Sequence, residues 1–196
     1  MQLPKRVQLK EVGPRDGLQN EKAFIPTADK IQLIDRLSET GLDYIEVTSF
    51  VHPKWIPQLA DAVDVLKAIK RNQNVTYAAL VPNAKGLERA LEANIDEVSV
   101  FMSASEGHNR SNINKSIDET FLILKEVVDG ALAAGKTVRG YISTVIACPY
   151  DGYTEPAQVV RIAEKLFEMG ITEISLGDTI GVGVPTQVDA LLTEML

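Results

Sequence analysis

Short apolar runs that suit buried strands alternate along the chain with longer segments whose apolar residues recur at helical spacing. The strand-like runs are Val7–Val12, Tyr44–Phe50, Val75–Val81, Glu97–Met102, Thr137–Thr144 and Thr172–Leu176. The helical patterns cover residues 27–40, 57–71, 84–93, 117–134 and 155–169, and a last one begins near Pro185. This alternation predicts an α/β fold with a parallel sheet and right-handed crossover connections.

The ends of the helical segments carry signals of their own. Ser116 and Glu119 have the spacing of a capping box, in which each side chain accepts a backbone N–H at the start of a helix. Proline and glycine mark other ends: Pro57 and Pro185 suit first turns, and Gly41, Gly135 and Gly170 suit C-terminal stops. These signals support the helix boundaries that the apolar spacing predicts.

The polar residues of the strands indicate how the sheet closes. In Tyr44–Phe50, strict alternation places Ile45 and Val47 on one face and Glu46 and Thr48 on the other. Ser99 and Ser103 are polar positions of the fourth strand-like run in the same way. Polar side chains gather near the carboxyl ends of the strands: Glu11 to Gln19, Glu46 to Ser49, Asn83, Ser103, Ser143, Thr144, Asp178 and Thr179. A (β/α)8 TIM barrel builds its active site at that face. An open doubly wound sheet would instead carry a glycine-rich phosphate loop after its first strand, which this sequence lacks.

The number of elements is smaller than a whole barrel requires. A TIM barrel has eight strands and eight helices over ~250 residues. The 196 residues show six strand-like and six helix-like segments, and the sequence stops inside the last helical pattern. We therefore expect residues 1–196 to form a single, incomplete TIM-barrel domain, truncated after about six βα units.

The most highly charged turn follows the first strand-like run. Residues 11–21 contain Arg15 and Asp16 between two glycines, with Glu11 and Glu21 at the ends. Burying an unpaired charge costs several kcal/mol or more, so we expect Arg15 and Asp16 to lie in an exposed turn that serves a ligand or metal. A solvated turn with an Arg–Asp pair is the alternative, and this pattern by itself leaves both open.

Composition excludes several classes of partner. The net charge of -7 and the lack of a Lys/Arg block argue against nucleic acid and anionic membranes. No apolar run is long enough to span a bilayer, and no signal or transit peptide is visible, which predicts a cytoplasmic protein. Cys148, the single cysteine, rules out an internal disulfide. Composition leaves the oligomeric state open, including a homo-oligomer.

Four features are given no functional role from the sequence. His52 and His108 are predicted to be exposed loop residues without metal-ligand spacing, and Ser103–Lys115 is predicted to be a long polar loop. Cys148 is not expected to be a nucleophile, because no histidine lies near it in the sequence.

Three spaced motifs carry a resemblance to a known family. They are Gly-Pro-Arg-Asp-Gly-Leu-Gln-Asn-Glu at residues 13–21, Ile-Glu-Val-Thr-Ser-Phe-Val at 45–51 and Ser-Leu-Gly-Asp-Thr-Ile-Gly at 175–181. The chain resembles the 3-hydroxy-3-methylglutaryl-CoA lyases, metal-dependent TIM-barrel lyases with an Asp, Arg and Glu signature, here Asp16, Arg15 and Glu46. The resemblance runs from about Leu3 to the last residue.

The resemblance implies cleavage of an acyl-CoA substrate, 3-hydroxy-3-methylglutaryl-CoA, into acetoacetate and acetyl-CoA, as in leucine degradation and ketone-body formation. It implies that Asp16 binds Mg²⁺ or Mn²⁺ through oxygen. Arg15 would direct its donors at the thioester oxygen, and Glu46 would orient Arg15. Asp178 is a candidate proton acceptor or positioning group, and Gln19 and Thr179 are candidate hydrogen-bonding residues for the substrate.

Several functional residues of the family have no counterpart in residues 1–196. Family members take further metal ligands from a His-x-His pair and an Asn, and a catalytic cysteine from a Gly-rich loop; we expect all of these beyond residue 196. This piece alone is therefore expected to be inactive and to bind metal weakly. Two alternatives stay open: a related condensing synthase or aldolase, and a non-catalytic barrel fragment.

Overall fold

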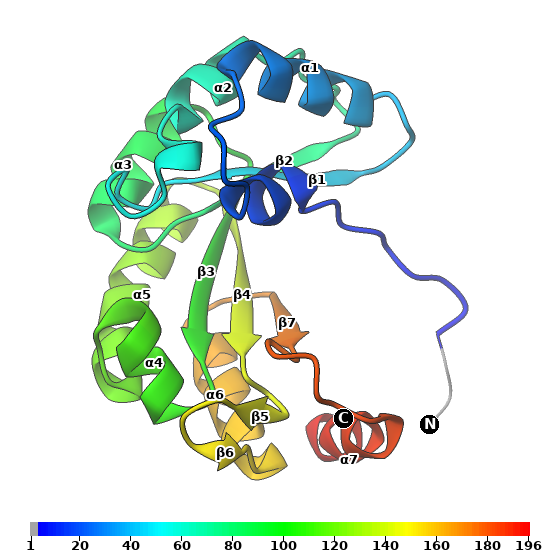
Figure 1. The fold of residues 1–196 in the computed structure, drawn as a ribbon, viewed down its shortest axis with the longest axis vertical. Helices are drawn as coiled ribbons and strands as arrows, with labels where there is room; N and C mark the ends of the chain where they lie inside the picture. The colour runs from blue at the N-terminus through cyan, green and yellow to red at the C-terminus, as the bar shows by residue number, and fades with distance from the viewer. Residues whose placement is uncertain (1–3) are drawn as a thin grey trace. The chain divides into compact units, whose positions relative to one another are not determined.

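The computed structural model describes residues 4–196, which divide into two compact units. One unit, called here the Arg15 unit, contains Pro4–Ser99 and Gly130–Thr137. The other, called the Asp178 unit, contains the described residues Val100–Asp129 and Val138–Leu196. Both consist of parallel strands and the helices that connect them (Figure 1). The predicted α/β fold is confirmed.

In the Arg15 unit, β1 (Tyr44–Ser49), β2 (Thr76–Leu80) and the start of β3 (Glu97–Ser103) lie side by side in parallel. The helical elements are η1 (Gly13–Gly17), α1 (Thr27–Leu37), η2 (Pro57–Leu59), α2 (Ala62–Ala68) and α3 (Ala84–Glu92). Its core includes Ile34, Ile45, Val65 and Tyr77, each at most 1% exposed. Burial of these side chains is the main force that holds the helices on the strands.

In the Asp178 unit, the rest of β3, β4 (Thr137–Ser143) and β7 (Glu173–Gly177) are neighbours in that order. The main helices are α4 (Glu106–Ile113), α5 (Ile117–Ala133), α6 (Pro156–Glu168) and α7 (Pro185–Met195). A short antiparallel hairpin joins β5 (Ala147–Cys148) to β6 (Gly152–Tyr153). Leu124 of α5 and Ile162 of α6 are among its fully buried apolar side chains.

Most of the predicted helix ends are confirmed. The Ser116 hydroxyl accepts the Glu119 N–H at 3.1 Å, and the Glu119 carboxylate accepts the Ser116 N–H at 2.8 Å, which completes the capping box before α5. Gly41, Gly135 and Gly170 all have positive φ, as C-terminal stops require.

Two predicted segments are wrong. Val7–Val12 does not form a strand: Glu11 makes an isolated bridge to β1 through backbone hydrogen bonds with Tyr44 and Glu46, and Val7 is 77% exposed. The predicted loop Ser103–Lys115 contains helix α4, which Ser105 caps by accepting the His108 N–H at 3.1 Å. A polar helix lacks the apolar period on which the sequence prediction rests.

Strand β1 also departs from strict alternation. Its register with β2 shifts between Glu46, which pairs with Ala78, and Thr48, which pairs with Ala79. Ala78 and Ala79 are consecutive, so their side chains point to opposite faces of the sheet. The predicted sharing of one face by Glu46 and Thr48 is therefore interrupted by a bulge.

Candidate functional site

The turn that carries Arg15 and Asp16 is a single π-helical turn, Gly13–Gly17. It follows Glu11, whose backbone bonds to β1 and whose carboxylate accepts the Gly13 N–H at 2.6 Å. A Cβ on Gly13 would lie 2.8 Å from that carboxylate oxygen, so a larger residue at this position would displace the Glu11 side chain. The contacts of Glu11 therefore fix the turn against the amino half of β1.

Arg15 is buried, contrary to the exposed turn predicted from the sequence. Its Nε donates to the carboxylate of Glu46 on β1, which is 0% exposed, and its Nη1 donates to Asp16 Oδ1 at 2.7 Å. A buried guanidinium is tolerated only when paired in this way. The ion pair with Glu46 thus offsets the free-energy cost of burying Arg15.

Asp16 lies at the surface beside the buried pair. Its side chain is 54% exposed, and its Oδ1 also accepts from Gln19 Nε2 at 3.1 Å. The turn therefore brings Arg15, Asp16, Gln19 and Glu46 together in one unit, as the sequence predicts. The geometry presents a carboxylate to solvent next to a cation whose orientation is fixed.

Asp178 and Thr179 belong to the Asp178 unit and are described there. The Asp178 carboxylate accepts the Gly183 N–H at 2.7 Å and the Val182 N–H at 3.3 Å, so it caps its own loop. A Cβ on Gly183 would lie 2.8 Å from Asp178 Oδ2. The Thr179 hydroxyl accepts the Thr144 N–H at 2.8 Å. Both side chains therefore have structural contacts, and their functional roles stay predictions.

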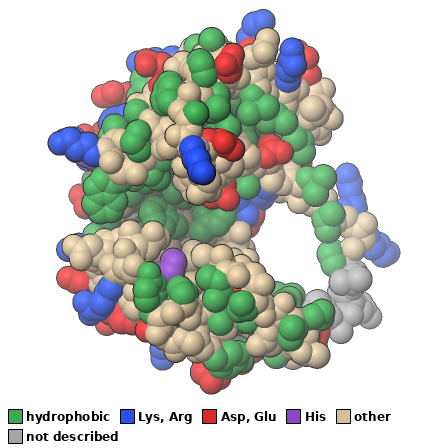
Figure 2. Space-filling model, in the orientation of Figure 1, with side chains coloured by type: hydrophobic (Ala, Val, Ile, Leu, Met, Phe, Trp, Pro, Cys, Tyr) green, Lys and Arg blue, Asp and Glu red, His purple; other side chains and the backbone are tan. Residues whose placement is uncertain are grey.

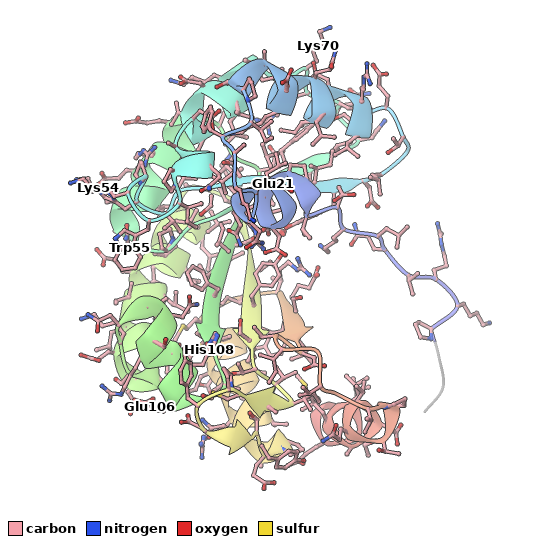
Figure 3. The ribbon with its side chains drawn as sticks, viewed as in Figure 1. Glu21, Lys54, Trp55, Lys70, Glu106 and His108 are labelled. Carbon is pink, nitrogen blue, oxygen red and sulfur yellow. The ribbon has the colours of Figure 1, made fainter. Side chains whose placement is uncertain are left out.

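His108 is not an exposed loop residue. It lies in α4, as does Glu106 (Figure 3), and its Nδ1 is 2.6 Å from Ser103 Oγ at the end of β3. Burial lowers the pKa of His108 below its ordinary value of 6.5. His52 is exposed, as predicted.

Cys148 is buried next to the start of α4. Its Sγ lies 2.7 Å from Ser105 Oγ, which is also 2.8 Å from Asp151 Oδ2. Burial raises the pKa of Cys148. The hydrogen bonds from Ser105 and from the N–H groups of Asp151 and Tyr150 together lower it by more, so the pKa lies below its ordinary value. The hydrogen bonds from Gly107 N–H and Ser105 lower the pKa of Asp151. These contacts tie the β5–β6 hairpin to α4.

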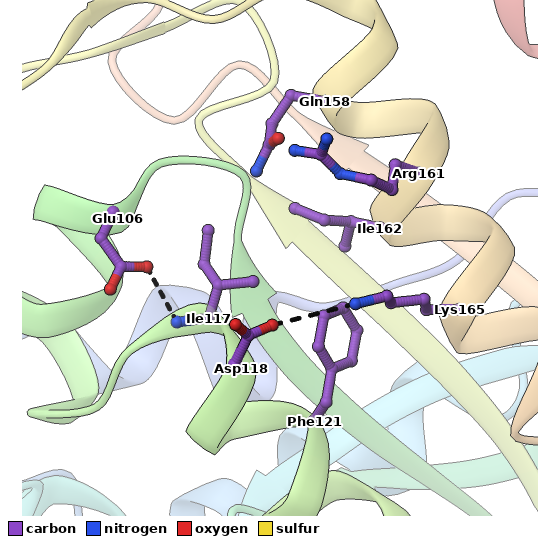
Figure 4. A pocket seen from close by; sticks show the side chains of 8 residues that line it. All are labelled: Glu106, Ile117, Asp118, Phe121, Gln158, Arg161, Ile162 and Lys165. Carbon is purple, nitrogen blue, oxygen red and sulfur yellow. Dashed lines mark hydrogen bonds and ion pairs between the residues drawn. The ribbon is translucent and has the colours of Figure 1, made fainter.

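A pocket of about 420 Å³ lies elsewhere in the Asp178 unit (Figure 4). It is lined by α4, α5 and α6, with Phe121 and Ile162 as apolar lining. Its acids have partners: Glu106 accepts the Ile117 N–H at 2.9 Å, and Asp118 lies 3.8 Å from Lys165. The lining includes none of the site residues predicted from the sequence, so we place the candidate chemistry at Arg15 and not here.

Three further features of the described residues bear on the predicted partners and location. On the face of the described residues shown in Figure 2, acidic and basic side chains are interspersed. Within residues 4–196, no helix is both long and apolar enough to cross a membrane. The described residues also contain no group of three or more His, Cys, Asp or Glu side chains placed to hold a metal ion. The predicted cytoplasmic location stays a prediction.

Comparisons with known proteins come from sequence and structure. The profile of the HMGL-like family matches residues 6–196. The chain is 60% identical over its full length to hydroxymethylglutaryl-CoA lyase YngG of Bacillus subtilis, covering 66% of that protein, and 55% identical to the mitochondrial hydroxymethylglutaryl-CoA lyase of Rattus norvegicus, covering 60%. The chain thus spans less than two thirds of the length of these relatives.

The solved structures that resemble this chain are also HMG-CoA lyases. The crystal structure of the Bacillus subtilis HMG-CoA lyase superposes with a TM-score of 0.97 at 60% identity, and all of this chain matches 65% of that one. An HMG-CoA lyase from Acinetobacter baumannii, solved in complex with coenzyme A and 3-methylmalate, has a TM-score of 0.92 at 38% identity, with 96% of this chain matching 62% of that one. The resemblance inferred from the motifs is confirmed, and the fold is a partial TIM barrel relative to these longer chains.

Proposed function

Because the chain belongs to the HMGL-like family, we propose that the whole protein cleaves 3-hydroxy-3-methylglutaryl-CoA into acetoacetate and acetyl-CoA. The observation that carries the proposal is the buried Arg15–Glu46 pair beside the exposed carboxylate of Asp16. The names of the relatives support this reaction, and the coenzyme A bound to one solved neighbour supports an acyl-CoA substrate.

The reaction needs two kinds of group. A base must remove the proton of the tertiary hydroxyl, and a donor must stabilise the negative charge that develops on the thioester enolate. Arg15 suits the second role because its planar guanidinium is permanently charged and Glu46 holds its Nε edge. A donor fixed before the reaction stabilises the transition state without reorganising.

Asp178 is proposed as the proton acceptor or a positioning group, and Gln19 and Thr179 as hydrogen-bonding residues for the substrate. Each already has a contact that fixes it: Asp178 with Gly183, Gln19 with Asp16, and Thr179 with Thr144. A side chain that is held in one rotamer loses less entropy when it binds the substrate.

HMGL-like enzymes are generally metal-dependent. The described residues do not fit a complete divalent-cation site, because they contain no cluster of three or more candidate ligands. Asp16 fits one position, since it offers an exposed carboxylate of the kind that Mg²⁺ and Mn²⁺ bind. We propose Asp16 as one ligand of such an ion, which would polarise substrate oxygens when bound.

The test compares the purified whole protein with the purified 196-residue chain. We expect the whole protein to release acetoacetate and acetyl-CoA from 3-hydroxy-3-methylglutaryl-CoA, and the 196-residue chain to show neither turnover nor tight binding of Mg²⁺ or Mn²⁺. An assay with acetyl-CoA and a keto acid, measuring free coenzyme A, tests for a condensing synthase. Turnover only in that second assay would overturn the proposed reaction.

Substitution of Arg15 tests its role within the same protein. Arg15→Met should lower kcat by about 1,000-fold or more while KM changes little, since the proposed contact is made mainly in the transition state. Arg110→Met is the matched control, because Arg110 forms an exposed ion pair with Glu106, and it should keep the wild-type kcat. A large rise in KM with kcat retained would assign Arg15 to ground-state binding instead.

A further inference from the structure

The Glu46 carboxylate is held at both of its oxygens. One oxygen accepts from Arg15 Nε, and the other accepts from the hydroxyl of Ser99 at 2.9 Å. Glu46 and Ser99 are both 0% exposed. A carboxylate bound at both oxygens cannot rotate about its terminal bond without losing one contact, so the Ser99 hydroxyl restricts the position of the group that binds Arg15.

Ser99 reaches Glu46 across an intervening strand. Glu46 on β1 pairs with Ala78 on β2, and Leu80 on β2 pairs with Ser99 on β3. Neighbouring strands lie ~4.8 Å apart, so β1 and β3 are separated by roughly twice that spacing. Ala78 is 0% exposed and lies on the face that Glu46 and Ser99 share. Its small side chain leaves room for Glu46 to extend over β2.

We propose that Ser99 is a positioning residue, which fixes the guanidinium of Arg15 through the carboxylate of Glu46, and that Ala78 is the small residue that permits this contact. The role in catalysis rests on the proposed lyase function. A hydroxyl that only stabilises the fold would lower stability when removed but would leave the orientation of Arg15 and kcat unchanged.

Kinetics of the whole protein provide the first test. Ser99→Ala should lower kcat roughly tenfold while KM changes less than about twofold, because the loss affects an interaction made in the transition state. Ser38→Ala is the matched control: Ser38 is also buried, in the same unit, and donates to the Ile34 carbonyl at 2.8 Å. It should lower the melting temperature to a similar extent and keep kcat. An unchanged kcat in Ser99→Ala would overturn the proposal.

The second test does not depend on activity. In the ¹⁵N-labelled 196-residue chain, the Nε–Hε signal of Arg15 is assigned by its loss in Arg15→Lys. Ser99→Ala and Ala78→Val should both shift this signal and speed its exchange with water. Ala79→Val is the control for Ala78→Val, since Ala79 is equally buried but lies on the opposite face; it should leave the signal unchanged.

The two tests separate the two proposals. If Ser99→Ala and Ala78→Val leave the Arg15 signal unchanged, the positioning role is overturned whatever the activity. If the signal shifts but the whole wild-type protein does not cleave 3-hydroxy-3-methylglutaryl-CoA, the positioning contact stands and the proposed function fails.

Discussion

The two loops predicted to carry the site differ in what their charged side chains contact. Arg15 is bound by Glu46, which lies 31 residues away on another element and is itself bound by Ser99, a further 53 residues along. Asp178 is bound by the N–H groups of Val182 and Gly183, four and five residues away in its own loop. The first network depends on the tertiary fold, whereas the second is a local turn.

This difference determines what each loop contributes to stability. Removing one member of a buried ion pair leaves the other charge without compensation, at a cost of about 3–5 kcal/mol. Removing a side chain that caps a partly exposed loop costs about 1 kcal/mol. The Arg15 network is therefore expected to be sensitive to single substitutions, and the Asp178 loop tolerant of them.

The largest effect is expected for Glu46→Gln. The amide keeps the shape of the side chain but removes the buried negative charge that Glu46 places against Arg15, so the free energy of unfolding should fall by about 3–5 kcal/mol. Asp129→Asn is the matched control, because the Lys125–Asp129 pair is exposed, and it should cost about 0.5 kcal/mol or less. Urea unfolding of the 196-residue chain measures both. Equal costs would remove the distinction between the buried network and a surface pair.

A smaller effect is expected at Asp178, where the substitution separates capping from chemistry. Asp178→Asn keeps an oxygen that can accept from Gly183, so stability should change by less than about 1 kcal/mol. If Asp178 accepts the substrate proton, kcat of the whole protein should still fall about 100-fold. Asp151→Asn is the control, because the Asp151 carboxylate also accepts a backbone N–H of the same unit, that of Gly107; it should keep kcat. Wild-type kcat in Asp178→Asn would leave only the capping role.

What the sequence predicts correctly depends on the same difference between local contacts and contacts that join distant elements. Local patterns correctly predicted β1, β2, β3, β4 and β7, and the Ser116–Glu119 capping box, because strand period and cap spacing are properties of neighbouring residues. The family motifs indicated Arg15, Asp16 and Glu46 as candidate site residues. The burial of Arg15 was not predicted, because it depends on Glu46 and therefore on the pairing of distant elements.

Other omissions have the same cause. Ser99 appeared in the sequence only as a polar residue on a strand, and the small side chain of Ala78 gives no signal until the strands are paired. Helix α4 was missed because its first turn is held by Asp151, whose carboxylate accepts the Gly107 N–H at 2.7 Å from 44 residues away. Polarity by itself suggested a loop.

The smallest effect is expected at His108, which, like Asp178, has a partner near it in sequence, Ser103. Because burial lowers its pKa below 6.5, the unfolded chain binds more protons than the folded chain between the two values. The free energy of unfolding should therefore rise with pH through this window and level off above about 6.5. His108→Gln should flatten that rise in urea unfolding at pH 5, 6 and 7.5. His52→Gln is the control, since it removes the other histidine from an exposed loop, and it should keep the wild-type slope. If His108→Gln keeps the full slope as well, the pH dependence arises from other groups, and the burial of His108 has no measurable effect on the pH dependence of stability.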